Sequence, residues 1–142
     1  WGDARVRSRG FSDRLTAEGL PLLPELSGDW SSDSGYRIGR SAPEIADATA
    51  IFVGNDQMAL GLIHALHERG IRVPEDISIV GFDDLPDARH FLPPLTTVRQ
   101  DFAALGRLSI QSLLSALDHD PTASSAMIEP ELVVRASTAR PR

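Results

Sequence analysis

Apolar residues recur along the chain at two spacings, one typical of helices and one typical of buried strands. Helical spacing is found in two stretches, at Ala59, Leu62, Ile63 and Leu66 and at Ile110, Leu113, Leu114 and Leu117. It predicts two amphipathic helices, one capped by Asp56 and the other by Asp101. Short apolar runs predict strands at 51–53, 77–82, 96–99 and 131–137, and a further short strand within 20–27.

Two more helices are predicted in the first third of the chain, over 3–19 and from a cap at Ser31 to about Ser41. Helices and strands therefore alternate, which predicts an α/β fold with a doubly wound, mostly parallel sheet covered on both faces. Such a sheet normally begins with a strand, whereas this chain begins with a helix. We therefore expect the first strand to lie upstream of Trp1 and the chain to be a fragment.

The composition argues against several classes of function. The net charge is −6, and acidic residues are spread along the chain, so nucleic-acid binding by this chain itself is disfavoured. There is no cysteine for a thiol nucleophile, a disulfide or a thiolate metal site. All 14 basic residues are arginine, which excludes Schiff-base chemistry and a Walker lysine. No apolar run approaches the roughly 20 residues that cross a bilayer.

Polar side chains follow two of the predicted strands. Asn55 comes after the strand 51–53, and Asp83 and Asp84 come after the strand 77–82. The carboxyl ends of parallel strands share one edge of a sheet, where open α/β folds bind ligands. From the residues alone, Asn55 is either a ligand contact or a turn residue. A loop cap is favoured for Asp84, and a helix cap for Asp56.

Other polar and aromatic residues give weaker signals. Trp30, in a Gly-Asp-Trp turn, is either a core residue or a platform for a flat ligand, and spacing alone favours the core. His64 and His67 share a helix face without a third ligand in register, so a solvated face is favoured over a metal site. His90 and His119 are expected on the surface. The motifs of a serine elbow and of a dinucleotide loop are both absent, so the case for catalysis is weak.

Several stretches together resemble the lac-repressor (LacI/GalR) family of bacterial transcription regulators. The most specific is the ordered combination of NDQMALG at 55–61, VPEDISIVGFDD at 73–84 and PPLTTVRQDF at 93–102. Three further stretches agree with it: RSRGF at 7–11, GDWSSDSGY at 28–36 and PELVVRAST at 130–138. The resemblance covers most of the chain.

This resemblance implies the fold of periplasmic binding proteins, in which two α/β lobes hold a small molecule and are joined by three crossings. Residues 1–97 would form the C-terminal lobe without its first strand. Residues 98–125 would cross to the N-terminal lobe and supply one of its helices. Residues 126–142 would return as the last strand and tail of the C-terminal lobe. The helix-turn-helix head and most of the N-terminal lobe have no counterpart in these residues.

The resemblance also implies which residues contact the effector: Arg7, Trp30, Asn55, Asp83 and Phe102. Their side chains suit a polyol, because they offer hydrogen-bond donors and acceptors for adjacent hydroxyls and a flat surface for a sugar ring. A dimer contact is implied for Leu60 and for Phe91, which lies in a Phe-Leu-Pro-Pro loop. The apolar residues of that loop are either exposed for a partner or packed locally.

By resemblance, the parent protein would be a cytoplasmic homodimer that senses a small-molecule effector, a sugar or alternatively a purine. Effector binding between the lobes would change the affinity for operator DNA, which only the absent head contacts. No enzyme activity, cofactor, metal or membrane contact is implied. Two alternatives stay open: a sugar-binding protein of a transporter, and an α/β enzyme that uses Asp83 and Asp84 with a metal. We expect the isolated chain to bind ligand poorly and to associate through its last helix.

Overall fold

The computed structural model describes residues 2–117 and 127–140, and its centre is a four-stranded sheet. The strands are β1 (Ala50–Phe52), β2 (Ser78–Asp83), β3 (Thr96–Arg99) and β4 (Glu131–Val133), in that order across the sheet. The first three strands are parallel, and β4 runs antiparallel to β3. The prediction of a mostly parallel sheet is therefore confirmed.

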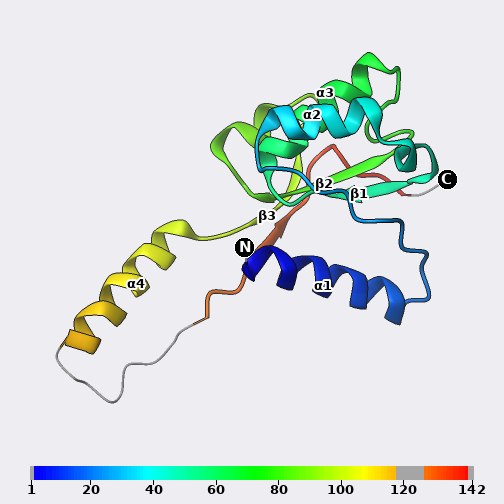
Figure 1. Ribbon diagram of the computed structural model, residues 1–142. Coiled ribbons are helices and arrows are strands. Elements are labelled where there is room, and N and C mark those ends of the chain that lie inside the picture. Colours follow the sequence, from blue (N-terminus) through cyan, green and yellow to red (C-terminus); the bar gives the residue numbers. More distant parts are fainter. Residues whose placement is uncertain (1, 118–126, 141–142) are drawn as a thin grey trace.

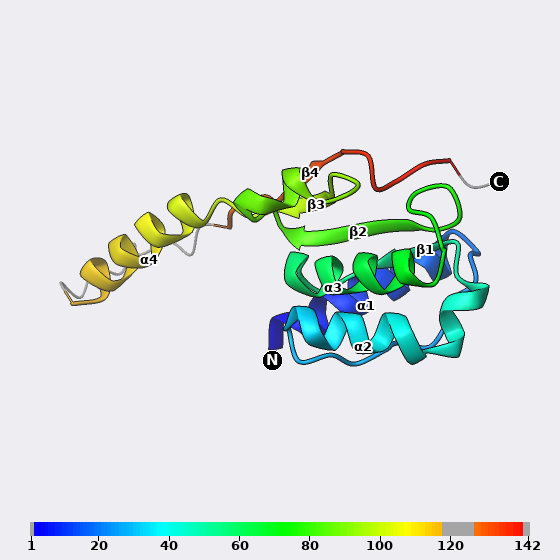
Figure 2. The same ribbon diagram turned by 90° about the horizontal axis from the view of Figure 1, so that it is seen from above.

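Helices lie on both sides of this sheet (Figures 1 and 2). The helices α2 (Ser32–Ser41) and α3 (Asp56–Glu68) cover one face, and α1 (Gly2–Ala17) lies on the other. The main core is on the side of α2 and α3 and includes the fully buried Leu66, Ile79 and Leu95. On the opposite face, the ring of Phe11 in α1 lies 5.4 Å from the ring of Phe52 in β1.

The helices α2 and α3 pack closely because glycines face the partner backbone. A Cβ atom added at Gly35 in α2 would overlap the carbonyl of Met58, and one added at Gly61 in α3 would overlap the carbonyl of Ser32. Only a residue without a side chain permits such an approach. The close contact brings the start of α2 beside the start of α3, and this places Trp30 next to Asn55.

The last helix, α4 (Phe102–Leu117), extends away from the sheet in both views (Figures 1 and 2). Its cap is Asp101, as predicted, because Oδ1 of Asp101 accepts a hydrogen bond from the amide of Ala104 at 2.8 Å. The predicted apolar stripe is exposed: between 55% and 67% of the surface of Ile110, Leu113, Leu114 and Leu117 is accessible. Within the described residues, no helix is long and apolar enough to cross a membrane.

Two predictions about strands differ from the structure. The segment 20–27 holds no strand: its prolines cannot donate backbone hydrogen bonds, and it is paired with no strand of the sheet. The last strand ends at Val133 rather than at 137. Beyond it, within the described residues, the chain is joined to β2 by a single backbone bond, from the N–H of Ile79 to the carbonyl of Ser137. Two short 3₁₀ helices, η1 (Pro43–Asp47) and η2 (Pro86–His90), were not predicted. The predicted loop at 118–126, with His119, lies outside the described residues.

The Phe-Leu-Pro-Pro loop packs locally at its first residue. Phe91 is 8% exposed and belongs to the main core, whereas its neighbour Leu92 is 88% exposed. The compact turn of η2 directs Phe91 inward, where Ala88 and Leu95 are also buried. In this structure the exposed apolar side chain of the loop is therefore Leu92.

Candidate functional site

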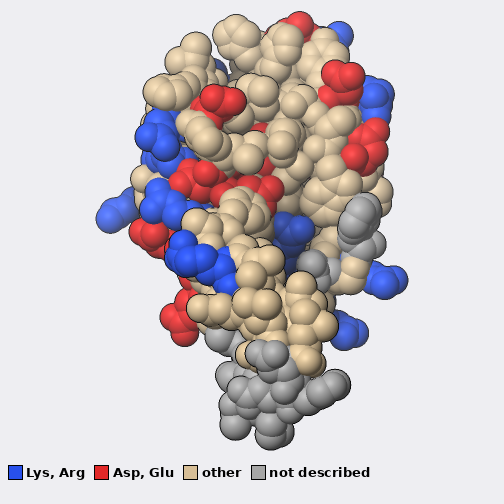
Figure 3. All heavy atoms as spheres, turned by 90° about the vertical axis from the view of Figure 1, so that its left-hand side faces the viewer, with Lys and Arg blue, Asp and Glu red and all other residues tan. Residues whose placement is uncertain are grey.

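The candidate site lies at the edge of the sheet where β1, β2 and β3 end, and where α4 leaves the sheet. Seen from that side, acidic and basic side chains lie close together, and neither sign forms a broad continuous patch (Figure 3). A mixed surface of this kind suits a polar neutral molecule better than a long polyanion.

Asn55 is the cap of α3, a role that sequence analysis assigned to Asp56. Its side-chain oxygen accepts a hydrogen bond from the amide of Met58 at 2.9 Å. Its side-chain nitrogen donates to the carbonyl of Trp30 at 3.0 Å and to Oε1 of Gln57 at 2.8 Å. Asn55 is only 7% exposed, and its hydrogen bonds link the start of α3 to the Trp30 turn that precedes α2.

Trp30 lies in the left-handed region of the backbone map, with φ of 72°. The hydrogen bond from Asn55 to its carbonyl helps to hold this uncommon conformation. Its half-buried indole lies against Gly54, where an added Cβ atom would be 3.2 Å from ring atom Cζ3. The absence of a side chain at Gly54 thus leaves room for the indole close to the end of β1.

Arg7 reaches this cluster from α1. Its Nη1 donates to the carbonyl of Gly54 at 3.0 Å. Its guanidinium carbon lies 4.2 Å from the ring centre of Phe82 and 5.5 Å from that of Trp30. Both contacts are within the range of cation–π attraction, which fixes the plane of a half-buried guanidinium. The structure therefore brings Arg7, Trp30 and Asn55 together, although the sequence separates them widely.

Asp83 ends β2 with φ of 110°, and Asp84 follows with φ of 54°. Two consecutive residues other than glycine at positive φ are strained, and such strain persists only where surrounding contacts hold it. Oδ1 of Asp83 accepts a hydrogen bond from Nε2 of Gln100 at 2.8 Å. Gln100 was not predicted as a site residue, because only the parallel pairing of β2 with β3 brings it to Asp83.

Both carboxylate oxygens of Asp84 form ion pairs with arginines. Its carboxylate lies 2.5 Å from Nη2 of Arg135 and 2.7 Å from Nε of Arg99, and only 6% of its side chain is exposed. Burial acts to raise the pKa of Asp84, but the hydrogen bonds and charges of Arg135 and Arg99 together outweigh burial and lower it. Asp84 therefore fastens the ends of β2 and β3 to the segment after β4, a larger role than the loop cap favoured from sequence.

Asp56 lies inside the protein, directly behind Asn55. Its carboxyl is fully buried and accepts hydrogen bonds from Thr97 Oγ1 at 2.6 Å and from the amide of Leu85 at 2.8 Å. Burial raises the pKa of Asp56 against the lowering effect of these two bonds, and the nearby carboxylates of Asp83 and Asp84 raise it further.

The remaining predicted site residues lie on helices. Phe102 begins α4, two residues after Gln100, and its ring is half exposed. Leu60 is exposed on α3. On the same helix, His64 lies against Tyr36 and 3.4 Å from a carboxylate oxygen of Glu68. Among the described residues, no three histidine or acidic side chains are placed to hold a metal ion.

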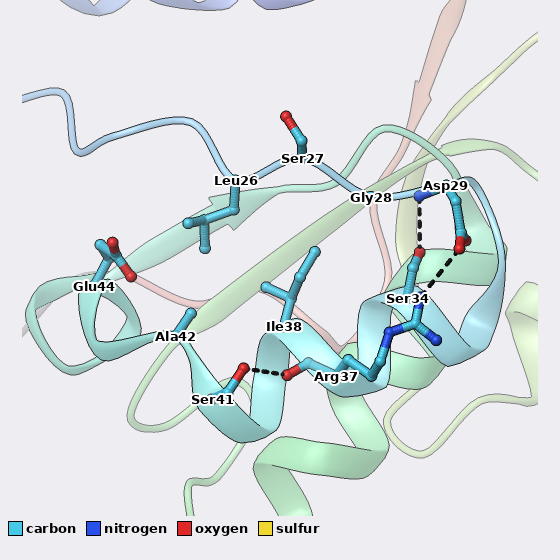
Figure 4. A pocket seen from close by; sticks show the side chains of 10 residues that line it. All are labelled: Leu26, Ser27, Gly28, Asp29, Ser34, Arg37, Ile38, Ser41, Ala42 and Glu44. Carbon is cyan, nitrogen blue, oxygen red and sulfur yellow. Dashed lines mark hydrogen bonds and ion pairs between the residues drawn. The ribbon is translucent and has the colours of Figure 1, made fainter.

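A separate cavity of about 410 Å³ lies between α2 and the segment that precedes it (Figure 4). Its polar groups largely satisfy one another: Asp29 pairs with Arg37 at 3.0 Å, and the Ser34 hydroxyl accepts from the amide of Asp29. Hydrogen bonds from Ser31, more than any other cause, lower the pKa of Asp29. The carboxyl-edge cluster, in contrast, presents Asp83 and Arg7 half-buried at the ends of the strands.

The chain is similar to known proteins along almost its whole length. The family described as periplasmic binding protein-like domain matches residues 2–138. The lactose operon repressor of Escherichia coli K12 is 40% identical over 139 residues, which are 97% of this chain and 39% of the repressor. The HTH-type transcriptional repressor PurR of Haemophilus influenzae Rd is 40% identical over 141 residues, covering 94% of this chain and 42% of PurR.

Solved structures agree with these relatives. The lac repressor dimer bound to operator and the anti-inducer ONPF superposes with a TM-score of 0.89 at 38% identity, covering 96% of this chain and 48% of that one. The complex of the transcriptional regulator CelR with cellobiose gives a TM-score of 0.84 at 33% identity, covering 92% of this chain and 41% of that one. The chain thus spans about two fifths of the length of the curated relatives that it matches.

Proposed function

Because the chain belongs to the family of periplasmic binding protein-like domains, and within it to the LacI-type regulators, we propose that it forms the C-terminal lobe of an effector-binding core. The effector is a sugar, and it binds at the carboxyl edge of the sheet. The observation that carries this proposal is the cluster of Arg7, Trp30, Asn55 and Asp83, which the fold assembles from four separate segments.

The cluster has the chemistry that a sugar needs. Asp83 is an acceptor for one or two hydroxyl donors, and a carboxylate makes stronger hydrogen bonds than a neutral acceptor. The guanidinium of Arg7 is a planar donor with N–H groups beyond the one bound by Gly54. Trp30 offers a flat apolar face, and Gln100 adds an amide that already binds Asp83. Asn55 contributes mainly by holding Trp30, since both ends of its amide are engaged.

A second lobe completes the site in this proposal. We propose that residues 1–97 and 126–142 belong to one lobe, and that residues 98–125 cross to the other. The exposed apolar stripe of α4 supports this division, because such a stripe is normally buried against a partner. Phe102, at the start of the crossing, then lines the cleft. Ligand binding favours one angle between the lobes, provided that it binds the two angles with different affinity.

The lobe angle in turn sets operator affinity in a dimer of the whole protein. Exposed apolar residues on α3 and on the loop before β3 support a dimer contact at Leu60 and at the loop that holds Phe91 and Leu92. The relatives named above are transcriptional repressors or regulators, which favours this function over that of a transport binding protein. An enzyme is also disfavoured, because Asp84 is held in ion pairs and Asp83 is hydrogen-bonded to Gln100.

Thermal unfolding in the presence of sugars and purines tests the proposal. The protein is the full-length product of the reading frame to which this chain belongs, and the panel contains pentoses, hexoses, disaccharides and purines. A ligand at about 100 times its Kd should stabilise the protein by about 2.7 kcal/mol. Asp83→Ala should abolish the effect, whereas Asp47→Ala, at the opposite edge of the sheet, should retain it. A stabilisation that survives Asp83→Ala would place the site elsewhere, and a panel without effect would contradict the sugar proposal.

A further inference from the structure

The buried carboxyl of Asp56 takes no direct part in the proposed ligand contacts, yet it joins three elements of the site. Both of its oxygens accept hydrogen bonds from uncharged groups, one from Thr97 in β3 and the other from the amide of Leu85. Asp56 itself is the first residue of α3, next to the cap Asn55. A single side chain thus connects the start of α3, the middle of β3 and the loop that follows β2.

The strand β2 is shaped to admit this carboxyl. Gly81 lies in the interior of β2, where glycine normally weakens a strand because it has no side chain to pack. A Cβ atom added at Gly81 would overlap Oδ1 of Asp56 and would lie 2.8 Å from a methyl carbon of Leu95. The carboxyl of Asp56 therefore occupies the space in which any other residue at position 81 would place its side chain.

The bond to Leu85 holds the far end of the strained turn. Asp83 and Asp84 are the two residues at positive φ, and Leu85 is the next residue along the chain. The ion pairs of Asp84 with Arg99 and Arg135 hold the turn from the outside. The bond from the Leu85 amide to Asp56 holds it from the inside, so the turn is fixed between the two.

We propose that Asp56 is a positioning residue, whose buried carboxyl sets the place of Asp83 relative to Trp30 and Asn55 by holding the amide of Leu85. The proposal rests on the function proposed above, because the distance between these groups matters only to a ligand that contacts both. A polyol is such a ligand, since hydroxyls at fixed separations require donors and acceptors at matching positions.

The hydrogen-bond partners of Asp56 suit both protonation states of its carboxyl. The hydroxyl of Thr97 can donate to a carboxylate or accept from a carboxylic acid, while the other oxygen of Asp56 continues to accept from Leu85. An asparagine can make the same two bonds, with its nitrogen donating to Thr97 and its oxygen accepting from Leu85. Asp56→Asn is therefore the conservative variant that should preserve the geometry, and Asp56→Ala is the variant that should destroy it.

The first readout needs no ligand. In ¹⁵N-labelled chain, the side-chain amide of Gln100 reports its bond to Asp83, and the backbone amide of Leu85 reports its bond to Asp56. Asp56→Ala should shift both signals relative to wild type. Asp56→Asn should leave the Gln100 signal close to its wild-type position. Thr97→Val, which removes one donor while retaining the Asp56 side chain, should shift the Gln100 signal even if Asp56→Ala does not fold. Ile63→Val, a core change on the same helix, should lower Tm without moving the Gln100 signal.

The second readout is the affinity for a sugar that stabilises the wild-type protein in the panel described above. Thr97→Val should weaken binding by about tenfold, and Asp56→Asn by much less. If the Gln100 signal stays in place in both Asp56→Ala and Thr97→Val, the positioning role is wrong, whatever the ligand results. If the signal moves as expected but no sugar binds the wild type, the positioning of Asp83 stands and the proposed sugar function fails.

Discussion

The helices α3 and α4 carry similar apolar stripes but have opposite environments. In α3, the stripe of Ala59, Leu62, Ile63 and Leu66 is at most 6% exposed, whereas the stripe of α4 is at least 55% exposed. The helix α3 packs against α2 and β2, and α4 extends into solvent (Figure 2). An apolar stripe thus predicts an amphipathic helix, but it does not say whether the same chain supplies the partner that covers the stripe.

The comparison shows which part of the chain is stabilised by packing within the chain itself. Short helices are marginal in water unless an apolar face is packed, so α4 depends on a partner that α3 already has. The division falls just beyond Arg99, whose ion pairs with Asp84 and Glu131 end the well-packed part of the sheet. We therefore expect the sheet with α1, α2 and α3 to fold as a unit, and α4 to gain stability only from a partner.

The largest difference should appear in hydrogen exchange of the isolated chain. Amides in α3, such as that of Leu66, should exchange only through global unfolding, which typically requires about 5–15 kcal/mol. Amides in α4, such as that of Leu113, should exchange through local opening that requires roughly 0–1 kcal/mol. NMR-detected exchange measures both in one sample. Equal protection of the two helices would show that α4 is already packed against something.

The same substitution in the two helices should have unequal effects. Leu66→Ala leaves a cavity in the core and should cost about 2–5 kcal/mol of the free energy of unfolding. Leu114→Ala removes an exposed side chain and should cost about 0.5 kcal/mol or less. Urea unfolding followed by circular dichroism compares the two variants, and similar losses would contradict the division of the chain.

Asp84→Asn tests the ion pairs that end the packed part. Replacing one partner of this buried cluster should cost about 2 kcal/mol at neutral pH. The lowered pKa of Asp84 means that its ionised form stabilises the fold above the ordinary value of 3.8. This contribution is lost as pH falls through the pKa of Asp84 in the folded protein. The difference in stability between wild type and Asp84→Asn should therefore shrink below about pH 3.8, and a difference independent of pH would contradict the ion-pair role.

The smallest effect concerns association of the isolated chain. The exposed stripe of α4 should cause concentration-dependent association, visible as a rising mass in light scattering. The paired change Ile110→Gln and Leu114→Gln keeps helix-forming residues and should lower the association. The matched pair Leu20→Gln and Leu22→Gln, in the irregular segment after α1, should have little effect. A wild-type chain that stays monomeric at all concentrations would refute this prediction.

Much of the fold follows from local pattern. The strand at 96–99 and the cap at Asp101 are found where they were predicted, because apolar runs and capping residues act over a few positions. The strand predicted within 20–27 failed because apolar residues make a strand only where a neighbouring strand supplies hydrogen bonds. For Phe91, a dimer contact and local packing were both left open from sequence, and the η2 turn packs its ring into the core; the dimer contact of its loop stays a prediction.

The site was harder to predict, because its geometry depends on contacts between distant residues. Asn55 and Asp56 are both good caps, and only the buried space beside Gly81 decides that Asp56 enters the core and Asn55 caps the helix. Gln100 has no local signal at all, since it meets Asp83 only through the pairing of β2 with β3. Whether Phe102 lines a cleft stays a prediction.

The most direct test of the central claim uses Trp30 as a reporter at the carboxyl edge. Trp1 is the only other tryptophan in these 142 residues. In the full-length product, replacing Trp1 and every tryptophan outside this chain by phenylalanine leaves Trp30 as the sole source of indole fluorescence. Titration with a sugar that stabilises the full-length product should change the Trp30 emission in a saturable way, and Asp83→Ala should abolish the change. If that sugar leaves the Trp30 emission unchanged at saturating concentration in the full-length product, with its other tryptophans replaced, the ligand does not bind at this edge.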